Sequence, residues 1–325
     1  MIRMDSRSAS PRSGQGETPS GPGPACLALL LCCLLVFIPG RGAGQAPEEA
    51  GEAPPTGKVE AAFLALYHFD FPAAERLSRD LQQGYPGSYL AHLARVNYFW
   101  WDMVTREDGS DRDPRYRETA ELAIRLSREA LQSGPRDVDL FFFISLHAMQ
   151  ARIDLLRGAW IRALQNLRHC AVQIEASAGR EEHFEGFYLT SGMYHYLMGQ
   201  ADRKYPFLRL YALLYPRGDK EKGLRQLEKA FRSGHVIWQT EAAYFLMRIH
   251  LDQEDNPGLA EPYARWLTGH YPGNLVYQYY HLRVLEAMGN GPDARAKREE
   301  LQRLAATHPT IGPEQRGHFL QLFGQ

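Results

Sequence analysis

The feature that most constrains the fold of this chain is the regular punctuation of helix-length segments by glycine and proline. Glycine tolerates the left-handed backbone at a helix end, and proline suits the first helical turn because that N–H has no partner. Glycines close such segments at Gly84, Gly134, Gly158, Gly179, Gly199, Gly234, Gly269 and Gly289, and prolines open others at Pro72, Pro114, Pro257, Pro292 and Pro313. The sequence has no alternating β-branched runs bounded by hairpin turns, so we predict an all-α fold.

The spacing predicts thirteen helices, of which twelve form six antiparallel hairpins and the last one caps the open end. Their predicted ranges are 58–69, 72–84, 88–104, 114–133, 137–157, 160–177, 181–198, 218–233, 236–252, 257–269, 274–288, 292–307 and 312–322.

The second helix of each predicted hairpin carries a small residue where it must approach its mate closely. These sites are Ala74, Ala123, Ala163, Gly223, Ala260 and Ala296, at intervals of 49, 40, 60, 37 and 36 residues. A similar helix-exit dipeptide occurs three times, as Tyr85-Pro86, Tyr271-Pro272 and His308-Pro309. The chain is therefore predicted to repeat one hairpin unit, with insertions between the earlier copies.

This skeleton resembles the tetratricopeptide repeat (TPR) family over residues 58–309, although the Trp-Leu-Gly-Tyr signature of the first TPR helix is not present. The ideal TPR period is about 34 residues, which the last two intervals approach. The block Tyr188–Gly234, which includes Met193–Leu197 and Gly218–Leu224, is similar to the inclusion-body-clearance TPR proteins, which have no assigned catalytic activity. The resemblance implies a right-handed superhelix (solenoid) of about six hairpins with a concave groove. The alternative fold is a compact helical bundle without a continuous groove.

Residues 1–46 have the features of a secretory leader. An uncharged apolar run from Cys26 to Ile38 follows a basic segment and precedes small residues, and cleavage is predicted near Ala46. A bilayer span needs about 20 apolar residues, so the run is short for a transmembrane helix. We expect export to the periplasm or cell envelope, with an uncleaved, membrane-anchoring leader as the alternative. Residues 47–57 are predicted to be a Pro/Gly/Glu linker before the repeat domain, 58–325.

Two insertions interrupt the repeats. Residues 106–113 carry several carboxylates, but their order does not match a calcium-binding loop, and we interpret them as a solvated loop. Residues 200–217 contain the apolar stretch Tyr205–Tyr215. We interpret this stretch as a short helix over its own repeat, and the alternative is a docking element for a partner or a membrane surface.

The sequence contains no recognisable catalytic set. There is no HExxH, G-x-S-x-G or glycine-rich phosphate loop, and the 12 histidines lack metal-ligand spacing. Cys170 occupies the small-residue position of a second helix, where we expect it to be buried and inert. The net charge of −1 gives no basic field for nucleic acid. We therefore predict a non-enzymatic protein without cofactor, metal or nucleic-acid partner.

First helices line the groove in TPR proteins, so helical phase predicts which polar or amphipathic residues face a protein or peptide partner. The candidates are Asn97, Trp101, His147, Gln150, Glu185, Tyr188, Glu241, Tyr244, Arg248, Gln278 and His281. The leading hypothesis is a protein–protein interaction scaffold that binds a peptide or helix in the groove. The alternatives are a ligand-binding protein or enzyme whose pocket is formed by residues 200–217, and a membrane-peripheral assembly factor.

Overall fold

A computed structural model describes residue 54 and the ranges 56–106, 114–134, 136–204 and 215–324. These residues form an all-α fold without strands, as predicted. The predicted leader, most of the linker, the acidic loop after Arg106 and the apolar stretch up to residue 214 lie outside the described residues. None of the helices described is long and apolar enough to cross a membrane.

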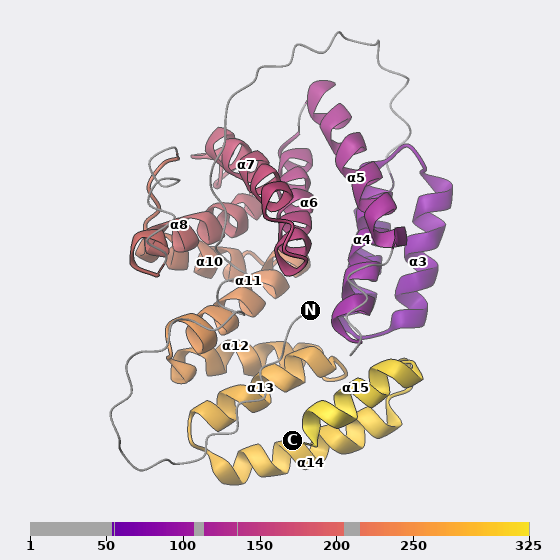
Figure 1. Ribbon diagram of the computed structural model, residues 1–325, viewed down its shortest axis with the longest axis vertical. Coiled ribbons are helices and arrows are strands. Elements are labelled where there is room, and N and C mark those ends of the chain that lie inside the picture. Colours follow the sequence, from indigo (N-terminus) through magenta and orange to yellow (C-terminus); the bar gives the residue numbers. More distant parts are fainter. Residues whose placement is uncertain (1–53, 55, 107–113, 135, 205–214, 325) are drawn as a thin grey trace.

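In the described part of the chain, six hairpins and a final helix follow one another around the molecule (Figure 1). The hairpins pair α2 (Thr56–Tyr67) with α3 (Phe71–Gly84), α4 (Tyr89–Val104) with α5 (Pro114–Gln132), α6 (Asp137–Leu156) with α7 (Trp160–Ser177), α8 (Gly186–Lys204) with α10 (Lys220–Arg232), α11 (Val236–Arg248) with α12 (Pro257–His270), and α13 (Leu275–Ala287) with α14 (Gly291–Thr307). The final helix is α15 (Pro313–Phe323), and a π-helical turn, η2 (Ile249–Gln253), extends α11. Each helix packs mainly on its neighbours in sequence, which is the arrangement of a helical solenoid.

Two local features differ from the sequence prediction. Helix α8 begins at Gly186 rather than near residue 181, because residues 181–183 form a turn. The predicted helix 236–252 changes from α to π geometry after Arg248. Single π-helical turns inside helices are often found at functional sites.

The small residues of the second helices are buried against their mates, with one exception. Ala74, Ala163 and Ala260 are fully buried, as is Gly223, but Ala296 is exposed. The buried small residue of α14 is Ala294, which lies 34 residues after Ala260 and thus at the ideal TPR interval. The prediction of Ala296 was wrong, because Ala296 lies two residues beyond Ala294 on α14 and is exposed instead of buried.

A close backbone contact joins α8 to α10 at glycine residues. A Cβ on Gly223 would lie 2.4 Å from the backbone nitrogen of Tyr196 and 2.7 Å from the carbonyl oxygen of Gly192. A Cβ on Gly218 would lie 2.3 Å from the backbone nitrogen of Gly199. No real side chain tolerates such distances, so these glycines are required for the two backbones to touch.

The Tyr-Pro-Gly segments before α4 and α13 repeat one hydrogen-bond pattern. His92 Nε2 donates to the carbonyl oxygen of Pro86 at 2.8 Å, and Gln278 Nε2 donates to that of Pro272 at 2.8 Å. In both cases the donor lies six residues after the proline whose carbonyl it binds. The second and sixth hairpins therefore share this hydrogen bond as well as their helical arrangement.

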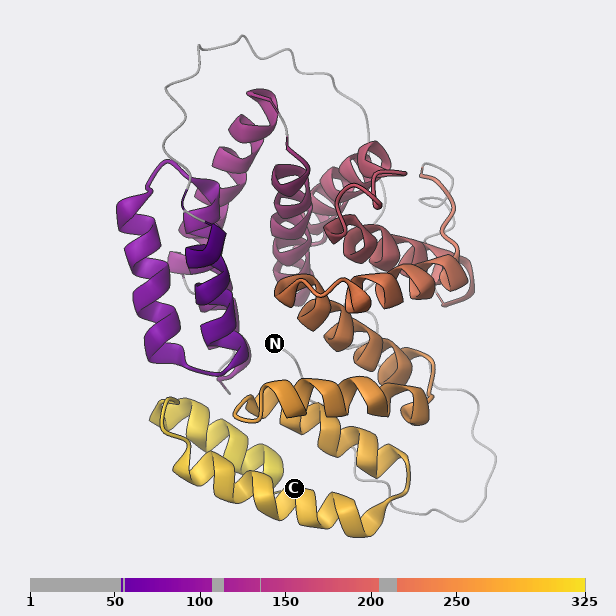
Figure 2. The ribbon, with the colours of Figure 1, turned by 180° about the vertical axis from the view of Figure 1, so that it is seen from behind.

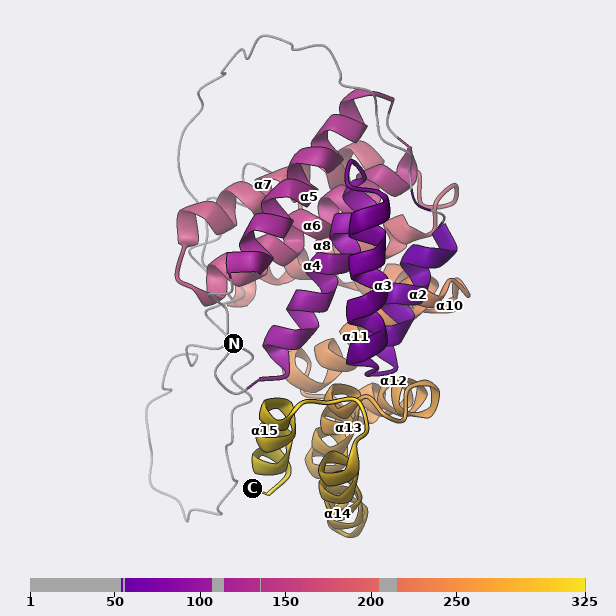
Figure 3. The same ribbon diagram turned by 90° about the vertical axis from the view of Figure 1, so that its right-hand side faces the viewer.

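The solenoid brings its two ends into contact. Asn274 Nδ2 donates to the carbonyl oxygen of Tyr67 at 3.0 Å, Thr310 Oγ1 donates to that of Phe69 at 2.6 Å, and Gln315 Nε2 donates to Thr105 Oγ1 at 2.8 Å. Figure 2 shows α2 on the inner side of α3, and Figure 3 shows α15 below the end of α4. The first hairpin thus packs on the last repeat, and the array is closed.

Candidate functional site

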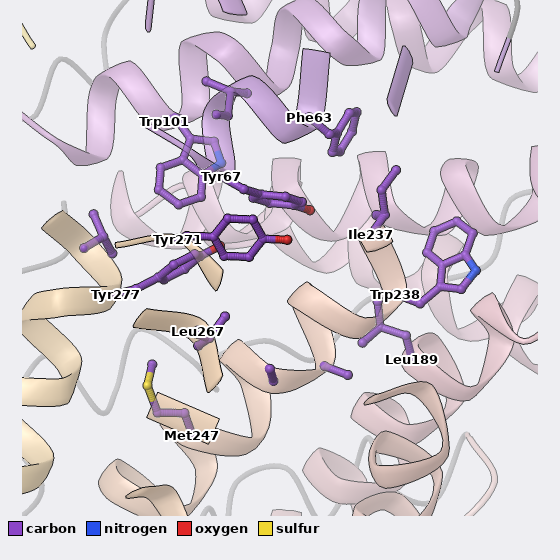
Figure 4. Close-up of a cluster of buried hydrophobic side chains, with 14 of the residues drawn as sticks. Phe63, Tyr67, Trp101, Leu189, Ile237, Trp238, Met247, Leu267, Tyr271 and Tyr277 are labelled. Atoms are coloured by element: carbon purple, nitrogen blue, oxygen red, sulfur yellow. The ribbon is translucent and has the colours of Figure 1, made fainter. Parts of the chain in front are cut away.

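The first helices of the hairpins line the inside of the closed array, where their aromatic side chains meet. Trp101 of α4 makes edge contacts with the ring of Tyr67 at a centroid distance of 6.4 Å and with that of Tyr277 of α13 at 5.8 Å. Tyr67 also packs on Tyr271, with ring centroids 5.6 Å apart (Figure 4). Much of the inner side is therefore filled by the core, and a partner can reach only the residues that remain partly exposed.

One such set follows α11 and η2 as a continuous strip. Glu241, Tyr244, Arg248 and Asp252 are spaced three or four residues apart, so they share one helix face, and all four are partly exposed. We call these four residues the α11 stripe. It has an acidic residue at each end, with a tyrosine and an arginine between them, and tyrosine and arginine are side chains suited to binding a polypeptide.

At one end of the stripe, Glu241 is held by the first hairpin. The Tyr67 hydroxyl donates to Glu241 Oε1 at 2.7 Å. Burial raises the pKa of Glu241, while the hydrogen bond from Tyr67 and the positive charge of Arg152 act in the opposite direction. Arg152 also lies over the ring of Trp100, 4.6 Å from its centroid. This end of the stripe thus joins α2, α4, α6 and α11.

At the other end, Arg248 is fixed by stacking and by a carboxylate. Its guanidinium lies over the ring of Tyr280 at 4.4 Å, its Nη1 donates to the Tyr244 hydroxyl at 3.1 Å, and its Nε donates to Asp252. Arg283 pairs with the other Asp252 oxygen at 3.1 Å. The Arg248 side chain remains 26% exposed, and its Nη2 makes no hydrogen bond with the described residues. A preorganised guanidinium with a free nitrogen can bind a carbonyl or carboxylate oxygen.

The structure brings together four of the predicted residues. Trp101 lies in the aromatic cluster beside Tyr67, which bonds Glu241, and Tyr244 and Arg248 continue along the stripe. Trp101 is only 8% exposed, so it packs on Tyr67 within the core and is not itself accessible to a partner.

The other predicted residues lie elsewhere. Asn97 and Gln278 are buried at helix contacts, Glu185 is exposed before α8, and Tyr188 packs under Lys229. His281 Nδ1 lies 3.2 Å from Thr268 Oγ1, at the contact between α12 and α13. His147 and Gln150 line a separate pocket beside α5 and α7.

Sequence reasoning did not identify Tyr67, Arg152, Asp252, Tyr280 and Arg283 as neighbours of the stripe. Asp252 follows Arg248 at the i,i+4 spacing of a helical ion pair, which was a usable signal. The other four lie on α2, α6 and α13, and only the packing of these helices around α11 brings them there.

The described residues contain no group of three or more histidine, cysteine or acidic side chains placed to hold a metal ion. Cys170 is buried, as expected, and its thiol donates to the carbonyl oxygen of Ile144 at 3.4 Å. Burial raises the pKa of this thiol to about 12, so it is a poor nucleophile. Glu181 accepts hydrogen bonds from Ser191 and Gln226 instead of facing a cation.

Comparison with known proteins identifies no relative. No family model, no curated protein and no solved structure matches the chain.

Proposed function

We propose that this chain is a non-enzymatic protein–protein interaction scaffold built from TPR-like hairpins, and that the α11 stripe binds a peptide or helix of its partner. The observation that carries the proposal is the partly exposed, prearranged pair of Tyr244 and Arg248 on an inner helix. Tyrosine and arginine are enriched among the residues that dominate binding energy at interfaces.

The TPR assignment is supported by three repeated features. The hairpins pack in sequence order, small residues lie at the contact within hairpins, and Ala260 and Ala294 are one TPR period apart. The duplicated hydrogen bond to Pro86 and Pro272 adds an atomic-level repeat.

The stripe favours a polypeptide over a small metabolite. Its side chains run along a helix and its continuing π turn, which suits an elongated ligand. Nη2 of Arg248, which makes no hydrogen bond within the described part of the chain, offers donors for a backbone carbonyl or an acidic side chain. Tyr244 offers an amphipathic ring with its hydroxyl. A peptide or helix presents acceptors and apolar side chains at matching intervals.

Site-specific photocrosslinking tests the proposal in the native cell. A photoreactive phenylalanine analogue at Tyr244 of the full chain should give a discrete crosslinked adduct with a protein. The same analogue at Leu259, which is 52% exposed on α12 of the same hairpin, is the control. Equal labelling from both positions, or none from Tyr244, would exclude the stripe as the binding surface.

Once the crosslinked segment is identified, Arg248→Ala should weaken its binding to the purified protein by roughly tenfold to a hundredfold, the range of an interface hot spot. Arg76→Ala, on the exposed side of α3, should leave the affinity unchanged. If Arg248→Ala binds the segment as tightly as the wild-type protein does, Arg248 does not contribute to the binding surface.

We further propose that the protein acts in the cell envelope after export by residues 1–46. The support is the short apolar run that follows a basic segment in the sequence. Amino-terminal sequencing of the protein from its native host should find a start near residue 47. An intact leader on envelope-bound protein would instead support the anchored form.

A further inference from the structure

A second concavity, separate from the α11 stripe, opens between α5, α6 and α7. Its volume is about 600 Å³, and none of its lining residues belongs to α11 or α13. Two acidic residues, Glu121 and Asp154, line it together with five arginines: Arg117, Arg125, Arg128, Arg157 and Arg162. The lining thus has a formal charge of +3 with neutral histidines, whereas the whole chain has −1. A concave site with this charge attracts anions.

A buried histidine forms part of the lining, and its tautomer follows from its neighbour. Asn166 Nδ2 donates to Asp154 Oδ2 at 3.2 Å and to the carbonyl oxygen of Arg162 at 3.0 Å, which fixes the orientation of the amide. Asn166 Oδ1 therefore faces His147 Nδ1, at 2.6 Å, and must accept a hydrogen bond from it. The proton of the neutral ring lies on Nδ1, and Nε2 carries a lone pair.

Two buried acceptors in this pocket have no partner among the described residues. They are His147 Nε2 and Gln150 Oε1, which lie one turn apart on α6. His147 is only 2% exposed, so water at the surface does not satisfy it. An unsatisfied buried polar atom destabilises the folded protein, so such atoms point to a ligand or an ordered water.

The cations at the rim are available to an incoming group. Arg117 and Arg128 are exposed and make no ion pair with the described residues. Burial is the main reason that the pKa of His147 falls to about 4; the bond to Asn166 opposes this, and the charges of His169 and Arg128 add to it. The pocket therefore combines arginine donors with a neutral imidazole that requires a hydrogen-bond donor.

We propose that this pocket binds a phosphate monoester, with the rim arginines holding its oxygens and its P–OH group donating to His147 Nε2. A phosphate monoester has a second pKa of about 6, so it can carry that proton near neutral pH. Sulfate and carboxylate groups carry none under these conditions, and both would place a lone pair against Nε2. A hydroxyl or amino donor on the organic part of the ester binds Gln150 Oε1.

Titration of the full chain with inorganic phosphate, O-phosphoserine and glycerol 3-phosphate tests the proposal. Calorimetry should give saturable binding with one site, tighter for the two esters than for inorganic phosphate. Nuclear magnetic resonance of ¹⁵N-labelled histidine should show a shift of His147 Nε2. Sulfate at equal ionic strength is the matched anion, and it should bind at least tenfold more weakly. Sulfate binding equal to phosphate, or no saturation at millimolar phosphate, overturns the proposal.

Two substitutions that each replace an arginine with an uncharged residue test whether phosphate binds in this pocket. Arg128→Gln removes an exposed arginine that has no ion-pair partner among the described residues, so the fold should persist while phosphoserine affinity falls about tenfold. Arg76→Gln makes the same charge change outside the pocket and should leave affinity unchanged. Equal effects of the two variants would mean that only the overall charge matters, and the pocket would be excluded.

This inference does not depend on the proposed function. Loss of phosphate binding in Arg128→Gln should leave photocrosslinking from Tyr244 intact, because the two surfaces share no residue. Each proposal can therefore fail without the other.

Discussion

At the scale of single residues, both candidate sites contain polar side chains that are buried beside aromatic rings. Tyr67 is fully buried and supplies a hydrogen bond to a carboxylate that burial disfavours. His147 is kept neutral by burial in the same way. Both side chains therefore have measurable effects on stability as well as a place in a candidate site.

Tyr67→Phe should destabilise the protein by about 1–3 kcal/mol, because Glu241 would lose the hydroxyl that stabilises its charge. Urea denaturation at pH 7 measures this difference. Tyr98→Phe is the control, since Tyr98 is partly exposed and its hydroxyl makes no hydrogen bond with the described residues; its change should stay within about 0.5 kcal/mol. A Tyr67→Phe protein as stable as the control would show that the bond to Glu241 contributes little.

His147 should make the protein less stable in acid. Its folded-state pKa, about 4, lies below the ordinary value of 6.5, so the unfolded chain binds the proton more readily. Stability from this group is present above pH 6.5 and is lost as pH falls toward 4, by an amount on the order of 3 kcal/mol. His147→Gln should flatten the dependence of the unfolding free energy on pH in this window. An unchanged pH dependence in His147→Gln would contradict the assigned role of this imidazole.

At the scale of elements, much of the fold could be predicted from residues whose backbone role is independent of context. Pro114, Pro257 and Pro313 begin helices as expected, and Asn256 caps α12 by accepting from the Leu259 amide at 3.3 Å. The start of α8 was predicted too early because Glu181 and Glu182 resemble a helical first turn, although they serve as hydrogen-bond acceptors for α8 and α10. Local sequence alone cannot distinguish these two uses of a carboxylate.

The candidate site was predicted less completely than the helices. Helical phase identified Glu241, Tyr244 and Arg248, since their spacing fixes a common face. Phase could not decide whether Trp101 or His147 faces a groove, a core or a pocket, because an aromatic or imidazole side chain suits all three. That choice depends on contacts between residues far apart in sequence, such as Trp101 with Tyr277.

Gly223→Ala should destabilise the hairpin of α8 and α10 by several kcal/mol, because the new Cβ would meet backbone atoms that cannot move aside. Gly317→Ala is the matched control in α15, where nothing lies within 4 Å. That variant should be stabilised by about 0.5–1 kcal/mol through helix propensity. Thermal unfolding followed by circular dichroism compares the two, and a Gly223→Ala protein as stable as wild type would refute the close backbone contact.

At the scale of the whole molecule, closure distinguishes this array from an open solenoid. Stability in an open solenoid is approximately a sum over neighbouring repeats. Here the ring of Phe69 packs on that of Phe319, with centroids 5.8 Å apart, and Thr310 binds the carbonyl oxygen of Phe69. The first hairpin therefore depends on residues that belong to the last repeat.

Phe319→Ala should destabilise the protein by about 3–5 kcal/mol and loosen the first hairpin as well as α15. Hydrogen exchange followed by mass spectrometry compares this variant with the wild-type protein. The exchange rate should increase more in α2 and α3 than in α6 and α7. The control is Leu227→Ala, at a fully buried position between α8 and α10. This variant should not increase exchange in α2 and α3 more than in the other helices. Unchanged protection of α2 in Phe319→Ala would mean that the contact between the ends is energetically weak.

The hydrogen bond from Asn274 to Tyr67 spans 207 residues of sequence. A ribosome makes the first hairpin long before it makes the surface that covers Phe69. Until then, this aromatic end of the hairpin stays open to wrong partners, including another copy of itself. We expect the newly made chain to need a chaperone, or to remain unfolded during translocation, until its final helices have emerged.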